Sequence, residues 1–145
     1  MESKVRSIVT LKDGVRCEAV SRNHTIVFDE SVEDGGGDSS VTPLEGLLAS
    51  VGGCQAITAR YLAKLKGINL KSFRIEVEGD VDLSGYKGVK GDIGFHNIQY
   101  IMHIDADNTK EEIEDFAESV ERHCPASETI KCIGDMLPTK VILGD

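Results

Sequence analysis

The chain has 145 residues, a formal net charge of −9 and an apolar fraction of 40%. This length predicts a single domain, residues 1–145, with enough apolar side chains for one hydrophobic core. The acidic balance argues against nucleic acid and anionic membrane surfaces as partners. The first residues lack the apolar run of a signal peptide, and the uncharged window 46–59 is too short to span a bilayer. We therefore expect a cytoplasmic protein with no membrane association.

The N-terminal part predicts an antiparallel meander of three strands. Alternating apolar residues indicate a first strand over residues 4–12, and Asp13-Gly14 marks the hairpin turn that follows it. A second strand covers residues 15–21, with Cys17 on its inward face as a core residue, and a third covers residues 25–29.

A long helix follows an acidic, glycine-rich segment, residues 30–41, which we expect to be a mobile surface loop. Pro43 suits the first helical turn and Gly67 suits the residue after the last, so the helix is predicted from Pro43 to Lys66. At about 1.5 Å per residue it is roughly 36 Å long, more than a small domain is wide. Apolar residues cover most of its circumference, which predicts burial nearly all round. One chain can hardly enclose such a helix, and we infer a second subunit.

Cys54 lies in the middle of this helix, on an apolar stripe. The two glycines before it, Gly52 and Gly53, indicate either a close backbone contact or a local break in the helix. The residues alone leave two interpretations of the thiol open: a small buried hydrophobe, or a reactive cysteine.

The second half predicts two more strands and two helices. Strict alternation over residues 73–83 indicates a half-buried strand whose inward face includes Val81 and Leu83, with a bulge at Gly79. Another strand covers residues 96–105. Its histidines, His96 on the inward face and His103 on the outward face, are expected to be structural or solvated.

The C-terminal part begins with an amphipathic helix over residues 109–123, in which Thr109 and Glu112 have the spacing of a capping box. Pro125 stops this helix and can start a short one over residues 126–133. A last strand over residues 137–143 completes an α+β fold.

Two further cysteines belong to this region. Cys124 precedes the short helix, where the helix dipole favours a thiolate, and Cys132 is expected to pack inside that helix. The four cysteines and four histidines show no metal-ligand spacing, so we expect neither a metal site nor a cofactor. Structural disulfides are not expected without secretion, which leaves redox or catalytic thiols as the alternative to inert ones.

The run TPLEGLLASVGGCQA and the later run RHCPASETI resemble the two cysteine motifs of the OsmC family, which includes the organic hydroperoxide resistance proteins. The resemblance covers most of the chain. It implies an OsmC-like intertwined homodimer, with two long central helices packed against antiparallel sheets from both subunits. It also implies thiol-dependent reduction of organic hydroperoxides, with a thiol or dithiol as the reductant.

The resemblance further implies the roles of four residues. Cys54 corresponds to the peroxidatic cysteine and Cys124 to the resolving cysteine, so that a sulfenic acid on the first condenses with the second to a disulfide. Glu45 stands one residue later than the glutamate of the organic hydroperoxide enzymes. The family's activating arginine corresponds to Arg16 or, alternatively, Arg22.

Two departures keep another function open. On an unbroken helix Glu45 lies about 180° round from Cys54, so it can approach the thiol only if the helix breaks at Gly52-Gly53. Without an activating arginine, a thiol in apolar surroundings has a raised pKa and reacts slowly. The alternative is a non-enzymatic or regulatory dimer that binds an apolar small molecule at its interface.

Overall fold

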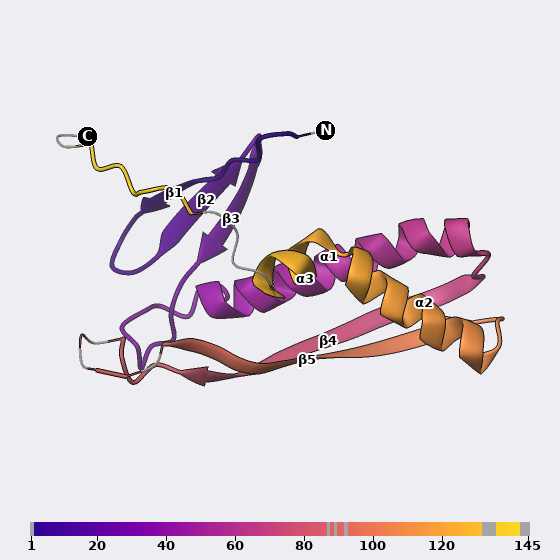
Figure 1. Ribbon diagram of the computed structural model, residues 1–145. Coiled ribbons are helices and arrows are strands. Elements are labelled where there is room, and N and C mark those ends of the chain that lie inside the picture. Colours follow the sequence, from indigo (N-terminus) through magenta and orange to yellow (C-terminus); the bar gives the residue numbers. More distant parts are fainter. Residues whose placement is uncertain (1, 87, 89, 92, 132–135, 143–145) are drawn as a thin grey trace. The chain divides into compact units, whose positions relative to one another are not determined.

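The computed structural model describes residues 2–86, 88, 90–91, 93–131 and 136–142 (Figure 1). In chain order the elements are β1 (Ile8–Leu11), β2 (Cys17–Ser21), β3 (His24–Phe28), α1 (Pro43–Lys66), β4 (Leu70–Asp82), β5 (Gly94–Ala106), α2 (Lys110–His123) and α3 (Pro125–Lys131). These helices and antiparallel sheets confirm the predicted α+β class. The homodimer stays a prediction.

The chain divides into two compact units, Met1–Ala49 and Ser50–Asp145, which are described one at a time. The prediction of a single domain over the whole chain stays a prediction. Among the residues that the structure describes, no helix is both long enough and apolar enough to cross a membrane.

The first unit holds a three-stranded antiparallel sheet in the order β1-β2-β3, which confirms the predicted meander. Its first strand begins at Ile8, because pairing with β2 starts only there, opposite Val20. Gly14 has a φ of 61° in the first turn, a conformation that a residue with a side chain rarely adopts. Ala19 is buried on β2, whereas Cys17 is only half-buried and is not the core residue predicted.

One carboxylate organises the loop that follows β3. Asp29 is 3% exposed and accepts hydrogen bonds from the Ser39 hydroxyl at 2.6 Å and from the backbone N–H groups of Glu30, Ser39 and Gly37. These hydrogen bonds, led by that of the Ser39 hydroxyl, lower the pKa of Asp29 to about 2. The composition of the loop did not predict this arrangement, because it depends on a charged residue just before the loop.

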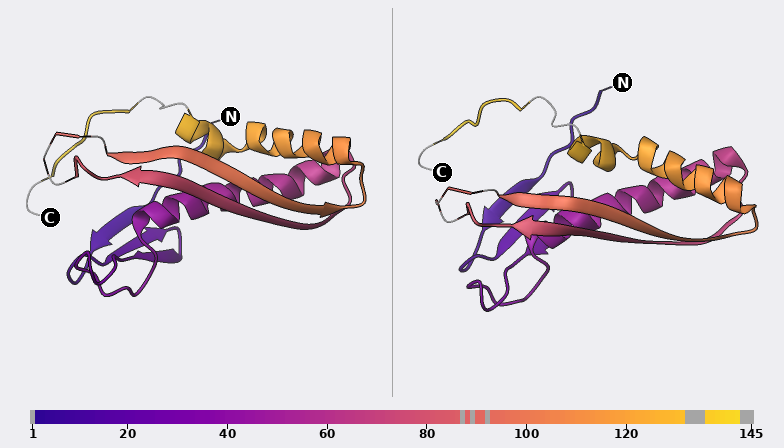
Figure 2. Two further views of the ribbon diagram at one scale, coloured as in Figure 1. Left: turned by 90° about the horizontal axis from the view of Figure 1, so that it is seen from below. Right: turned by 60° about the horizontal axis from the view of Figure 1, so that its bottom comes forward.

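The second unit is built on a long antiparallel ribbon of β4 and β5 (Figure 2). The pairs Phe73–Ile104, Ile75–Met102 and Val77–Tyr100 place half-buried apolar side chains opposite one another. The intervening residues of β4 are charged and exposed, as the alternation predicted. This apolar face of the ribbon supports the helices of the unit.

The predicted alternation fails beyond Gly79. The register of β4 against β5 shifts between Glu78 and Asp80, which confirms the bulge predicted at Gly79. The extra residue lies in β5, where two residues stand opposite Gly79, and such a bulge distorts the pairing and the side-chain directions around it. Beyond it, Val81 and Leu83 are 43% and 47% exposed instead of facing inward, and His96 of β5 is exposed as well.

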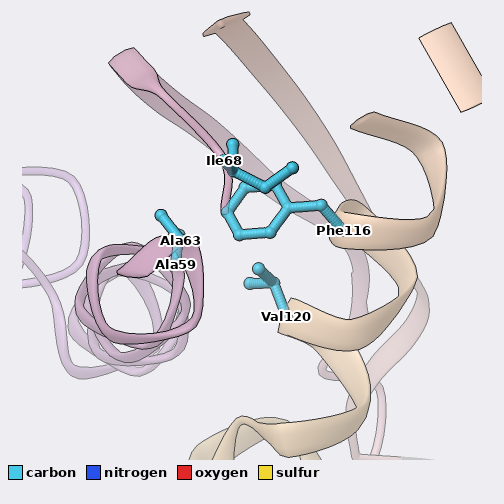
Figure 3. Packing of buried hydrophobic residues seen from close by; sticks show 5 residues of the cluster. All are labelled: Ala59, Ala63, Ile68, Phe116 and Val120. Atoms are coloured by element: carbon cyan, nitrogen blue, oxygen red, sulfur yellow. The ribbon is translucent and has the colours of Figure 1, made fainter. Parts of the chain in front are cut away.

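The core of the second unit lies between α1, α2 and the ribbon (Figure 3). Phe116 and Val120 of α2, both fully buried, point toward the small side chains Ala59 and Ala63 of α1. Complete burial of a side chain such as Phe116 contributes about 1.5–3 kcal/mol relative to exposure. This packing fixes α2, and therefore its C-terminal end, against the middle of α1.

Both helices begin as predicted. In α2, Thr109 Oγ1 accepts a hydrogen bond from the backbone N–H of Glu112 at 3.2 Å, and Glu112 Oε2 accepts from the Thr109 N–H at 3.0 Å. Helix α1 keeps the predicted limits and continues through Gly52 and Gly53 without a break. A Cβ atom on Gly52 would lie 3.1 Å from Val77 Cγ2, so this glycine permits a close approach of α1 to β4.

The single chain covers only part of α1, so the prediction that this helix is buried nearly all round with the help of a second subunit stays a prediction. Its buried residues, such as Val51 and Ala59, lie on one side of the helix. On another side Ile57, Tyr61 and Leu65 are 59%, 67% and 81% exposed. The apolar pattern predicts which side chains of the helix are buried in the functional protein. It does not predict whether the same chain or a partner subunit buries them.

The predicted last strand is also absent. Residues 136–142 form no strand, because they pair with no other strand among the described residues, and Leu137 and Ile142 are 87% and 80% exposed. The predicted short helix is confirmed over Pro125–Lys131. Its expected last residues and Cys132 lie outside the described residues.

Candidate active site

Two thiols from distant parts of the sequence meet in the second unit. Cys54 lies on α1, and Cys124 is the residue between α2 and α3. Their side chains lie close together, since each thiol is among the groups that affect the pKa of the other, and neither forms a disulfide. The structure thus brings together the two cysteines that the resemblance paired.

The junction of two helices holds Cys124 in place. The residue caps the C-terminus of α2, where its N–H donates to the Glu121 carbonyl at 3.4 Å. Its own carbonyl accepts from the Glu128 N–H at 3.0 Å and so starts α3. Because Pro125 cannot continue α2 through its missing N–H, the chain turns here and directs the Cys124 side chain inward, where it is 0% exposed.

The two sulfur atoms differ in access. Cys124 is completely enclosed, whereas Cys54 is half-buried. Of the two cysteines, Cys54 is therefore the one that a solute can contact in the single chain.

The surroundings shift the pKa values of the two thiols in opposite directions. Burial raises the pKa of the Cys54 thiol, and the hydrogen bond from the Ala126 N–H offsets this only in part. Burial acts on Cys124 too, but the N–H and hydroxyl of Ser127, with Cys54 and the Ala126 N–H, donate to its sulfur and lower its pKa. The surroundings therefore disfavour a thiolate on Cys54 and favour one on Cys124.

Two buried polar residues beside the pair were not predicted. Gln55 Nε2 donates to Ser127 Oγ at 2.6 Å, and both side chains are 0% exposed. Gln55 Oε1 has no hydrogen-bond partner within the described part of the chain. The sequence did contain a signal for Gln55, which is a polar residue inside an otherwise apolar helix and directly follows Cys54.

Glu45 has a structural task at the start of α1. Its carboxylate accepts from the Thr42 N–H at 2.9 Å, and its own N–H donates to Thr42 Oγ1 at 3.2 Å, which forms a capping box. These hydrogen bonds lower the pKa of Glu45. Because α1 is unbroken at Gly52-Gly53, the condition for Glu45 to approach Cys54 is not met, and its role in catalysis stays a prediction.

The two candidate arginines belong to the first unit. Arg16 pairs with Glu18 at 3.1 Å, and Arg22 is exposed in the turn after β2, with a φ of 57°. The cysteine pair belongs to the second unit, so an activating arginine also stays a prediction. Within the described residues, no three His, Cys, Asp or Glu side chains gather as metal ligands.

The fold and the site define an α+β protein whose central helix carries one thiol of a pair. A family model described as "OsmC-like protein" matches residues 35–133, more than half of the chain. The chain therefore belongs to the OsmC-like family, as the two cysteine motifs indicated.

Relatives span nearly the same length. A "hydroperoxide reductase" from Mycoplasma genitalium is 29% identical over 133 residues, covering 90% of this chain and 89% of that protein. Among solved structures, an OsmC-like protein from Mycoplasma pneumoniae has a TM-score of 0.79 at 24% identity, covering 92% of this chain and 91% of that chain. An organic hydroperoxide resistance protein from Legionella pneumophila has a TM-score of 0.65 at 16% identity, with coverages of 90% and 92%. These structural likenesses confirm the fold.

Proposed function

We propose that this protein is a thiol peroxidase that reduces organic hydroperoxides, with Cys54 as the peroxidatic and Cys124 as the resolving cysteine. The observation that carries the proposal is the pair of thiols itself, in which the half-buried Cys54 lies beside the enclosed Cys124. Membership of the OsmC-like family and the relative named hydroperoxide reductase support the same chemistry.

The proposed reaction begins when the Cys54 thiol loses its proton to solvent. The resulting thiolate attacks the O–O bond of the hydroperoxide. Cys54 becomes a sulfenic acid, and the alkoxide that leaves takes a proton from solvent to give an alcohol. The Cys124 thiol then condenses with the sulfenic acid, which forms a disulfide and releases water. A thiol or dithiol reductant restores the two thiols.

The surface next to Cys54 favours an organic substrate. Ile57 and Tyr61 lie one and two turns along α1 from Cys54 and are largely exposed. In the homodimer proposed below these side chains lie at the interface, so a hydroperoxide that reaches Cys54 enters apolar surroundings, which favour an alkyl or aryl hydroperoxide over hydrogen peroxide.

We propose in addition a homodimer that works in the cytoplasm. The side chains of Ile57, Tyr61 and Leu65 form an exposed apolar face of α1. A partner surface of similar length would remove this face from water. The C-terminal segment also exposes apolar residues, such as Leu137 and Ile142, which a partner surface would bury. A second copy of the chain supplies such surfaces in matching positions by symmetry.

Turnover of an organic hydroperoxide in the presence of dithiothreitol tests the peroxidase. The Cys54→Ser variant is expected to lose turnover, since a serine hydroxyl cannot be oxidised by a hydroperoxide as a thiolate is to a sulfenic acid. Cys17→Ser serves as the matched control, because Cys17 lies on β2 and makes only a weak hydrogen bond to the Val15 carbonyl. Turnover by Cys54→Ser at the rate of the unchanged protein would refute the assignment.

The raised pKa of Cys54 favours one other function, a non-enzymatic dimer that binds an apolar small molecule at its interface. Native mass spectrometry of the purified protein separates the two. A retained apolar ligand without peroxide turnover would support the binding protein, and turnover by a ligand-free dimer would support the peroxidase.

A further inference from the structure

One buried hydrogen bond joins the two segments that carry the thiols. Gln55 Nε2 on α1 donates to Ser127 Oγ on α3 at 2.6 Å, and both side chains are 0% exposed. Gln55 directly follows Cys54, and Ser127 is the third residue after Cys124. The hydrogen bond therefore lies beside both cysteines, although its two partners are 72 residues apart in the sequence.

The first turn of α3 relates this hydrogen bond to Cys124. The Cys124 carbonyl accepts from the Glu128 N–H at 3.0 Å, so Cys124, Ser127 and Glu128 belong to one closed helical turn. Residues in such a turn keep their positions relative to one another. A contact that fixes Ser127 on α1 therefore also fixes Cys124 beside the middle of that helix.

An ion pair at the other end of α3 does not fix this turn on α1. Lys131 pairs with Glu121 of α2 at 3.1 Å, but the two side chains are 45% and 42% exposed. Exposed ion pairs contribute little to stability, and this one connects α3 to α2, whereas Cys54 lies on α1. The hydrogen bond between Gln55 and Ser127 is enclosed at both ends, where water does not compete with it.

Fold stability alone does not explain a polar pair at this place. Gln55 Oε1 has no hydrogen-bond partner among the described residues, and an unpaired buried acceptor is unfavourable. Two apolar side chains of similar shape would fill the same space at little or no cost in stability. A hydrogen bond differs from such a contact because it fixes both the distance and the direction between its atoms.

We propose that the hydrogen bond between Gln55 and Ser127 positions Cys124 for disulfide formation with Cys54. The inference rests on the proposed function in one respect, namely that these two cysteines form a disulfide. In the reduced protein the hydrogen bond has already ordered the first turn of α3 on α1. The disulfide then forms without that entropic cost, so the effective concentration of one thiol at the other is high.

Equilibration with reduced and oxidised glutathione tests the inference without any peroxide. The full chain carries Cys17→Ser and Cys132→Ser, so that Cys54 and Cys124 are the only thiols. Oxidised glutathione takes two electrons and two protons from this pair and becomes two molecules of reduced glutathione, while the disulfide between the two cysteines forms. Alkylation and mass spectrometry then measure the fraction of oxidised protein at each glutathione ratio.

Loss of the hydrogen bond is expected to make the disulfide less favourable. Ser127→Ala should lower the effective concentration about tenfold, which raises the reduction potential of the pair by about 30 mV. Gln55→Leu, which removes the amide at similar volume, should shift the potential in the same direction. Ser119→Ala is the matched control and should shift nothing, since Ser119 is also fully buried but its hydroxyl accepts from Arg122 of its own helix.

The double variant Gln55→Leu/Ser127→Ala separates positioning from stability. It leaves no polar group of the pair unpaired, so its free energy of unfolding should stay near that of the unchanged protein. Its potential should nevertheless shift as far as that of Ser127→Ala, and no further, because both substitutions remove the same hydrogen bond. The double variant also carries the test if a single variant does not fold.

A potential of the double variant equal to that of Ser119→Ala would overturn the inference. Additive shifts of the two single substitutions would overturn it as well, since Gln55 and Ser127 would then act separately. If the unchanged protein forms the disulfide but reduces no hydroperoxide, the proposed function is refuted, while the shifts in potential still decide the inference. If it forms no disulfide at any glutathione ratio, both are refuted.

Discussion

The thiols of Cys54 and Cys124 lie close enough that each affects the pKa of the other, although one cysteine lies in the middle of α1 and the other between α2 and α3. The packing of Phe116 and Val120 against α1 holds the two segments together. Since Cys54 is half-buried and Cys124 is enclosed, we expect the oxidant and the reductant of the proposed reaction to attack Cys54.

Removal of the resolving thiol is expected to trap the first oxidation product. In Cys124→Ser, a hydroperoxide converts Cys54 to a sulfenic acid that has no thiol to condense with. A sulfenic acid reagent followed by peptide mass spectrometry should find its adduct on Cys54. The reciprocal variant, Cys54→Ser, should give no adduct on the enclosed Cys124, and an adduct there would contradict the assigned order.

Close packing at Gly52 predicts a stability difference between two neighbouring glycines. Gly52→Val places a Cβ 3.1 Å from Val77 Cγ2 and is expected to lower the free energy of unfolding by about 1–3 kcal/mol. Gly53→Ala meets nothing within 4 Å and should raise it by up to about 1 kcal/mol, because alanine favours the helix. Chemical denaturation measures both, and equal losses would count against the described approach of α1 to β4.

The hydrogen bonds to Asp29 predict a pH dependence of stability. The pKa of Asp29 in the folded protein is about 2, below its ordinary value of 3.8. Its stabilisation is therefore complete above about pH 4 and is lost as the pH falls through about 2. Asp29→Asn should lower the thermal midpoint at neutral pH and weaken its dependence on pH in that window. Asp38→Asn, on the exposed part of the same loop, should change neither, and a pH profile of Asp29→Asn like that of the unchanged protein would disprove the prediction.

The exposed face of α1 predicts how the homodimer can be broken. Tyr61→Glu places a charge where the proposed partner packs, at a cost of about 3 kcal/mol, and should weaken dimerisation roughly a hundredfold. Analytical ultracentrifugation measures the change. Glu111→Lys, an equally exposed charge change on α2, should leave the dimer intact. A monomer in the unchanged protein, or a dimer of full strength in Tyr61→Glu, would exclude this interface.

Features with local causes could be predicted from the sequence. The limits of α1 follow from Pro43 and Gly67, and the capping box of α2 follows from Thr109 and Glu112, because each depends on residues within a few positions. The two cysteine motifs predicted membership of the OsmC-like family, which the family model confirms, while the roles of Cys54 and Cys124 stay predictions.

Features that depend on distant partners could not be predicted. The contact between Gln55 and Ser127 joins segments that meet only when α2 packs on α1. The bulge was predicted at Gly79, but the exposure of Val81 depends on which residues of β5 pair with β4 beyond the shift. The strand predicted at the C-terminus failed because alternation identifies a strand-forming segment without identifying its partner.

Disulfide mapping after oxidation tests the central claim most directly. The reduced protein is treated with one equivalent of an organic hydroperoxide, digested without reductant and analysed by mass spectrometry. We predict a single new cross-link between the peptides of Cys54 and Cys124, formed before any change at Cys17. Consumption of the hydroperoxide without this cross-link, or a cross-link that joins other cysteines, would contradict the account.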